Sequence, residues 1–109
     1  MYEYHGWITV RETPENTDEE RIGEIVSELK EHIGRLNWDP GVLDLRAVNG
    51  EYHLWTAGND NRRPAPEYDP VNLFRYVGKI APGSYGILYV WDDEDRNGYD
   101  NRFRVYVLA

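Results

Sequence analysis

Cysteine is absent from the 109-residue sequence. No disulfide framework can form, and the chain is compatible with a reducing compartment. Apolar runs of about 18 residues, the length that a transmembrane helix needs, are also missing. Residues 1–7 are neither basic nor apolar enough for a secretory signal. We therefore expect a cytoplasmic protein that does not enter a membrane.

Basic side chains are few, since 12 Lys and Arg stand against 20 Asp and Glu and the formal net charge is −8. Nucleic-acid affinity depends on Lys and Arg that neutralise phosphates, so this charge disfavours a nucleic-acid partner and an anionic membrane surface. A basic protein partner would be attracted, and its association would be accelerated. The alternative interpretation is that the charge only keeps the protein soluble.

Signatures of catalysis and of cofactor binding are missing as well. The segment 83–86, Gly-Ser-Tyr-Gly, opens a strand after a helix, which is the reverse of a phosphate site at a helix N-terminus. Neither a nucleophile elbow nor a zinc motif occurs. We expect no catalytic residues, no metal and no cofactor.

Aromatic residues, by contrast, are abundant: four Trp, nine Tyr and two Phe make up 14% of the chain. They fit either a compact core or a recognition surface. The hydrophobic share of 40% suffices for one modest core. At this length we expect residues 1–109 to form a single domain.

Alternating and helical patterns predict the elements of the first part of the chain. Residues 2–11 alternate as in a strand, and one face of it carries Tyr2, Tyr4, Ile8 and Val10. Thr17 and Glu20 have the spacing of a capping box. The helix that follows repeats apolar residues at 3.6-residue spacing, namely Ile22, Ile25, Val26, Leu29, Ile33 and Leu36. Segment 37–41 ends this helix.

Turn signals divide the remainder of the chain. Asn49-Gly50 tolerates positive φ angles and predicts a hairpin between strands 42–48 and 51–57. Segment 58–68 is interpreted as an exposed loop. Asp69-Pro70 predicts the start of a helix that runs to residue 80. Strand 85–91 is apolar on both faces, as in a central strand, and is followed by an acidic turn, 92–100, and a last strand, 102–108.

The order β-α-β-β-α-β-β predicts an α+β fold, a mostly antiparallel five-stranded sheet with two helices on one face. The first six elements match the split βαβ arrangement of ferredoxin-like folds, extended by one hairpin strand.

Two segments share four of five letters, Glu-Tyr-His-Gly-Trp at 3–7 and Glu-Tyr-His-Leu-Trp at 51–55. Because the first and third strands are neighbours in a ferredoxin-like order, Glu3, His5, Glu51 and His53 could converge as metal ligands or as an acid–base pair. A small hydrolase or isomerase is the enzyme alternative. The competing interpretation is a chance repeat in a chain rich in Tyr, Trp and Glu.

The acidic turn also resembles the opening of a calcium loop, with Asp93, Asp95, Asn97 and Gly98 in place. The twelfth position of such a loop needs a bidentate Glu, but Arg104 stands there. A hairpin turn with its tip at Asn97-Gly98, or an acidic prong for a basic partner, is the favoured interpretation.

Two further surfaces are candidates for binding. Three acidic residues of the first helix, Glu20, Glu24 and Glu28, recur at i, i+4 spacing, and Glu31 is close beside them. Such spacing destabilises a helix slightly and indicates either a binding surface or a solvated face. The sheet face without helices is expected to carry Trp7, Trp55 and Tyr106. Loops or a second copy could cover these rings, and in an RNA-binding domain they would stack on bases, which the charge disfavours.

Several segments together resemble the immunity protein 7 family of bacterial polymorphic toxin and contact-dependent inhibition systems. They are Tyr4–Trp7, Val48–Leu54, Ala81–Gly86, Asp92–Asp95 with Asn97-Gly98, and Val105–Leu108. The resemblance runs over nearly the whole chain, and it depends on the number and order of the segments.

The resemblance implies a cytoplasmic antidote, encoded beside its toxin, that binds a cognate toxin domain, often a nuclease or another intracellular enzyme, and blocks it. It supplies no catalytic residues. We expect Trp7 and Trp55 to anchor the toxin and acidic groups to steer it: Glu24, Glu28, Asp92, Asp93, Glu94 and Asp95. The alternative is an aromatic-face module for nucleic acid or a small ligand. Both a monomer and a homodimer are compatible with the sequence.

Overall fold

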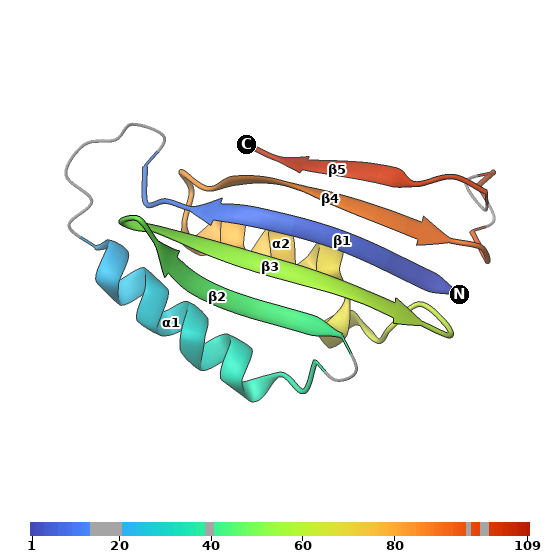
Figure 1. Ribbon diagram of the computed structural model, residues 1–109, viewed down its shortest axis with the longest axis horizontal. Coiled ribbons are helices and arrows are strands. Elements are labelled where there is room, and N and C mark those ends of the chain that lie inside the picture. The colour runs from blue at the N-terminus through green and yellow to red at the C-terminus, as the bar shows by residue number, and fades with distance from the viewer. Residues whose placement is uncertain (14–20, 39–40, 96, 99–100) are drawn as a thin grey trace.

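A computed structural model describes residues 1–13, 21–38, 41–95, 97–98 and 101–109 (Figure 1). Its strands form one sheet in the order β2-β3-β1-β4-β5, and all neighbours are antiparallel. The strands are β1 (Tyr2–Val10), β2 (Val42–Val48), β3 (Glu51–Asp60), β4 (Tyr85–Asp92) and β5 (Arg104–Leu108). The five-stranded antiparallel sheet is thus confirmed. The first four strands have the order of the split βαβ arrangement, and β5 extends the sheet beside β4.

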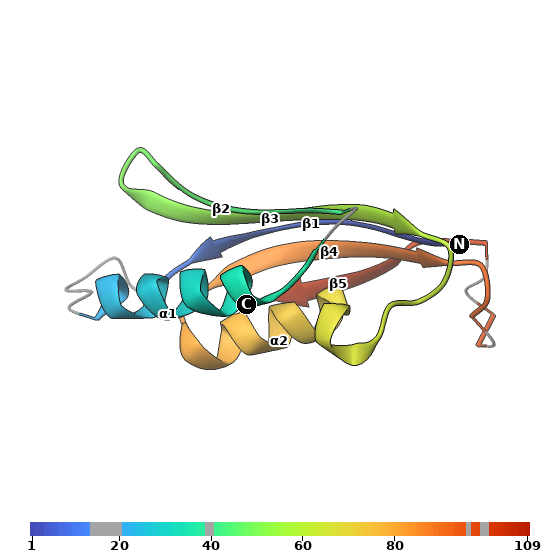
Figure 2. The same cartoon turned by 90° about the horizontal axis from the view of Figure 1, so that it is seen from below.

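Two α-helices lie on the same face of this sheet and leave the other face without a helix (Figure 2). They are α1 (Ile22–Arg35) and α2 (Pro70–Ile80), and the short 3-10 helix η1 (Pro66–Tyr68) precedes α2. This arrangement confirms the α+β prediction. None of the helices in the described part of the chain is long and apolar enough to span a bilayer.

The start of α2 follows the predicted signal. Asp69 is the N-cap, its side chain accepts a hydrogen bond from the backbone N–H of Val71 at 2.9 Å, and Pro70 occupies the first turn. The capping box proposed for the first helix, Thr17 with Glu20, lies outside the described residues. In the described part of the chain, α1 begins at Ile22.

The hairpin between β2 and β3 has the predicted turn, with φ of 51° at Asn49 and 83° at Gly50. The interpretation of segment 58–68 as a loop was wrong at its start, because β3 continues to Asp60 and pairs with β1. Gly58 lies opposite Tyr4, and a Cβ there would be 2.4 Å from the Tyr4 hydroxyl. A residue without a side chain lets the strand run past this ring.

The core lies between the sheet and the helices. Its buried side chains come from the predicted face of β1, from the same face of β3 and β4, and from the apolar stripes of both helices. They include Tyr2, Tyr4, Ile8, Val10, Ile25, Leu29, Leu54, Leu73, Phe74, Val77, Leu88 and Val90.

The last strand differs from its prediction at two points. It begins at Arg104 rather than at residue 102. Tyr106, which was expected on the open side of the sheet, pairs with the buried Leu88 and packs against the core. The exposed side of β5 instead carries the two neighbours of Tyr106 in the chain, Val105 and Val107.

Candidate functional site

The sheet face opposite the helices carries apolar side chains from all five strands. The antiparallel register places them on the same side as Trp7. Many are large and exposed: Trp7, Val42, Val48, Trp55, Tyr85, Tyr89, Val105 and Val107. We call this surface the open face. Contiguous exposed apolar surface of this kind marks interaction sites in proteins.

The centre of the open face is formed by two tryptophans. Trp7 of β1 and Trp55 of β3 are direct partners in the register, and 40% and 62% of their surfaces are exposed. The Trp7 ring contacts Tyr85 edge-on, with centroids 6.2 Å apart. Strand pairing therefore brings both predicted anchors together on the surface.

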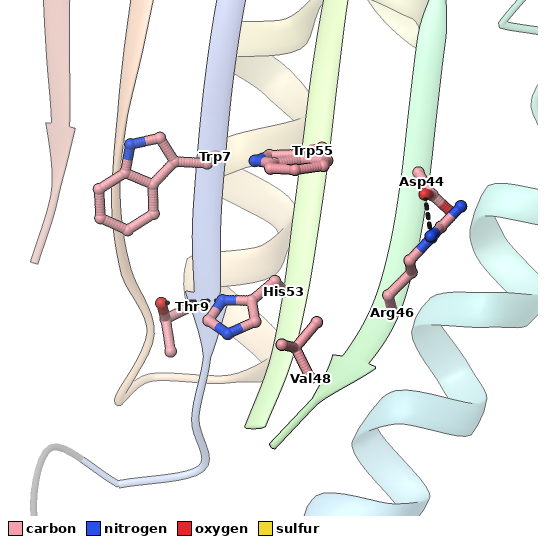
Figure 3. A pocket seen from close by; sticks show the side chains of 7 residues that line it. All are labelled: Trp7, Thr9, Asp44, Arg46, Val48, His53 and Trp55. Atoms are coloured by element: carbon pink, nitrogen blue, oxygen red, sulfur yellow. Dashed lines mark hydrogen bonds and ion pairs between the residues drawn. The ribbon is translucent and has the colours of Figure 1, made fainter. Parts of the chain in front are cut away.

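Hollows lie on both sides of this tryptophan pair. One has a volume of about 320 Å³ and is lined by Trp7, Thr9, Asp44, Arg46, Val48, His53 and Trp55 (Figure 3). The other, of about 360 Å³, includes His5, Val42 and Tyr89 in its lining together with both tryptophans. The two indoles thus stand between recesses that side chains of another protein could fill.

The charges within the first hollow are compensated. Arg46 donates to Asp44 across 2.6 Å, and the Thr9 hydroxyl lies 3.3 Å from Nδ1 of His53. Exposed pairs of this kind contribute little to stability. The two charged residues of the lining therefore neutralise each other, and Trp7, Val48 and Trp55 supply apolar surface, as at the centre of a protein interface.

Aromatic surface continues from Trp7 towards β4 and the segment before β5. Phe103 contacts Tyr89 edge-on at 6.4 Å and lies 6.3 Å from the Trp91 ring. At the other end, the Arg11 guanidinium lies 5.6 Å from the Tyr85 ring centroid and forms an ion pair with Glu51. Sequence reasoning missed Tyr85, Tyr89 and Phe103. Tyr85 and Tyr89 share one face of strand 85–91 with Ile87, because their positions differ by two. This spacing was the available signal.

The convergence of Glu3, His5, Glu51 and His53 that the repeated segments allowed does not occur. In antiparallel strands the second copy runs in the reverse direction, so the tryptophans meet and the histidines separate. His5 lies opposite Ala57, and its Nε2 is hydrogen-bonded to Oε2 of Glu3 at 2.9 Å. His53 lies opposite Thr9. In the described part of the chain, no three His, Asp or Glu side chains are grouped to hold a metal ion.

The acidic helix residues lie in the other layer. Glu24 and Glu28 are exposed on α1, and Glu24 is 3.5 Å from Arg21. Burial, and then the charge of Glu28, raise the pKa of Tyr76 on α2. The structure therefore separates this acidic stripe from the tryptophan pair by the thickness of the sheet.

The acidic turn after β4 is held by its own carboxylates. Asp92 and Asp95 accept hydrogen bonds from backbone N–H groups two residues ahead, at 3.0 and 2.7 Å. Asp93 contacts the N-terminal ammonium at 2.7 Å and raises its pKa. Asp95 lies 3.3 Å from Arg104, and its side chain is 14% exposed. Among the described residues of this turn, Asp93 and Glu94 are thus the exposed carboxylates.

Fold and surface together define a class: an α+β protein in which helices cover one sheet face and aromatic side chains occupy the other. The family model for immunity protein 7 matches residues 1–109, the whole of this sequence. The chain therefore belongs to the immunity protein 7 family and is an immunity protein directed against a toxin, as the resemblance implied. Comparisons with curated proteins and with solved structures gave no match.

Proposed function

We propose that the protein neutralises its toxin by direct, stoichiometric binding of the open face to the active surface of the toxin domain. The observation that carries this proposal is the exposed tryptophan pair at the centre of that face, Trp7 and Trp55. Trp and Tyr are enriched among the residues that dominate binding energy, and such residues cluster near the centre of an interface. The flanking hollows would receive side chains of the toxin.

The charge distribution supports a basic toxin, such as a nuclease. The net charge of −8 accelerates the approach of a basic domain. Asp92, Asp93, Glu94 and Asp95 lie at one end of the sheet, and Glu24 and Glu28 lie in the helix layer. Since charges act over a Debye length of about 8 Å at physiological salt, carboxylates outside the contact contribute mainly to the association rate.

The proposal also covers the setting of this binding. The protein acts in the cytoplasm as a single domain, residues 1–109, without a cofactor, a catalytic residue, a nucleic-acid partner or a membrane partner. Its non-enzymatic character agrees with the family to which it belongs. Both a monomer and a homodimer are compatible with binding through the open face.

The test is a titration of the protein with the toxin domain encoded by the neighbouring gene, together with an assay of toxin activity. We expect a one-to-one complex and loss of toxin activity at the same stoichiometry. Trp55→Ala removes an exposed side chain, so the fold is retained, while the Kd should rise about 30-fold, as for a residue worth about 2 kcal/mol in binding. Lys79→Ala, an exposed change on α2, is the control and should leave the Kd unchanged.

Unchanged toxin binding by both Trp7→Ala and Trp55→Ala would contradict the proposed interface. The same exposed aromatics also support the alternative of base stacking. A gel shift with single-stranded RNA at low salt separates the two functions, and we expect no shift because the protein is strongly acidic.

A further inference from the structure

A second surface feature lies in the helix layer, away from the open face. Three aromatic side chains from distant segments meet near the C-terminal ends of α1 and β3. They are Tyr4 of β1, Trp38 after α1, and Tyr68 of η1. Together with Asn37, Asp60, Arg62, Pro64 and Ala65 they line a hollow of about 370 Å³. We call this hollow the aromatic corner.

The rings of the aromatic corner stand at steep angles to one another. Tyr4 and Trp38 have centroids 6.3 Å apart and an interplanar angle of 86°, and Trp38 and Tyr68 have centroids 6.5 Å apart and an angle of 67°. Trp38 and Tyr68 therefore present ring surface to the hollow, while the almost fully buried Tyr4 packs against Trp38. The faces of aromatic rings carry negative electrostatic potential, and boxes of such rings bind ammonium and guanidinium groups.

A carboxylate completes the corner. Asp60 ends β3 and is half-buried, and among the described residues no ion-pair or hydrogen-bond partner reaches its side chain. Burial, and then the charge of Asp60, raise the pKa of Tyr4, which places this carboxylate near the ring. A half-buried carboxylate beside aromatic rings favours a cation as its counterpart.

One residue of the lining opposes a cation. Arg62 is exposed and lies on the same hollow. Its long side chain can turn to solvent, and it therefore weakens cation binding without filling the space. This residue provides a test with the opposite sign to Asp60.

From this geometry we propose that the aromatic corner binds an organic cation, an alkylammonium or a guanidinium, against the rings of Trp38 and Tyr68 and the carboxylate of Asp60. The site is separate from the open face, and it does not depend on toxin occlusion. The cation is supplied either by a free small molecule or by a Lys or Arg side chain of a protein partner.

The experiment follows the indole N–H signal of Trp38 by NMR, assigned with the Trp38→Phe variant, in the full chain. Tetramethylammonium and N-acetyl-argininamide are the probes, and sodium acetate is the anionic control. We expect saturable shifts at millimolar concentrations with both cations and none with acetate. Asp60→Asn should weaken binding about tenfold, as the loss of a charge-assisted contact does, whereas Arg62→Gln should strengthen it.

Absence of a saturable shift with either cation would overturn the proposal. So would a shift with acetate that Arg62→Gln abolishes, because the corner would then be an anion site. If Asp60→Asn does not fold, the wild-type titrations and Arg62→Gln still decide. A titration of the toxin complex with tetramethylammonium identifies the source of the cation. Loss of the Trp38 response in the complex assigns the corner to a toxin side chain, and retention of the response assigns it to a free cation.

Discussion

Asp69 connects three elements, and its replacement gives a quantitative test of the structure. Its side chain is almost fully buried, at 3% exposure. One oxygen caps α2 through Val71, and the Tyr2 hydroxyl lies 3.5 Å from the same oxygen. The other oxygen accepts two hydrogen bonds from the Arg63 guanidinium, at 2.9 and 3.1 Å. We predict that Asp69→Ala lowers the free energy of unfolding.

The magnitude follows from these contacts. Loss of a helix N-cap costs about 1 kcal/mol. The ion pair with Arg63 contributes at most about 1 kcal/mol, because the Arg63 side chain is 63% exposed and screened by solvent. Asp69→Ala should therefore cost about 2 kcal/mol. Asp69→Asn keeps a good capping group and loses only the charge, so it should cost about 1 kcal/mol or less.

Urea unfolding followed by tryptophan fluorescence at neutral pH measures both variants. Arg63→Gln is the matched control, since it removes the ion pair and leaves the cap intact. Its cost should be at least that of Asp69→Asn, because it leaves the buried Asp69 carboxylate without its counter-charge. An Asp69→Ala variant as stable as the wild type, or an Asp69→Asn variant as unstable as Asp69→Ala, would refute this division between cap and charge.

Three further predictions concern packing, pH and steering. Gly86→Ala should destabilise the fold by about 1–3 kcal/mol in urea unfolding, because a Cβ there would lie 2.1 Å from a backbone oxygen of β1. At Gly34 a Cβ would meet no atom within 4 Å, so Gly34→Ala should stabilise α1 by about 0.5–1 kcal/mol. Burial raises the pKa of Tyr2 above its ordinary value of about 10. The unfolded chain therefore ionises first, stability should fall as the pH rises above about 10, and Tyr2→Phe should reduce this fall. The double change Glu24→Lys/Glu28→Lys should slow toxin association in stopped-flow at low salt and leave dissociation unchanged, and equal association rates would remove these carboxylates from steering.

Local signals in the sequence predicted most of the elements. The 3.6-residue stripe of α1, the Asn49-Gly50 turn and the Asp69-Pro70 helix start each depend on neighbours within a few positions. Each of them acts in the same way in most folds. For this reason the structure confirms them with only small shifts at the ends of strands.

Non-local packing accounts for what was predicted wrongly. Gly58–Asp60 has the composition of a loop, and it is a strand because β1 pairs with it and Tyr4 lies against Gly58. Tyr106 faces the helices because the pairing of β5 with β4 aligns it with Leu88. A strand pattern with apolar residues at every position does not state which face is buried, and only the partner strand decides this.

In the candidate site, too, local patterns predicted one part of the arrangement and non-local pairing decided the other. Alternation along β1 and β3 placed Trp7 and Trp55 on one face, and the antiparallel register made them direct partners. The histidines of the same two segments were separated by that register. The register of pairing, which one sequence does not reveal, therefore distinguishes an aromatic surface from an acid–base site.

The central position of β1 has a consequence for synthesis of the protein. This strand precedes every other described element, yet it pairs with β3 on one side and β4 on the other, and Tyr2 lies opposite Asp92. Contacts between such distant positions form late, because a long loop must close first. A partly translated chain therefore lacks the neighbours of β1 until β3 and β4 have left the ribosome, and the centre of the sheet cannot form before that point.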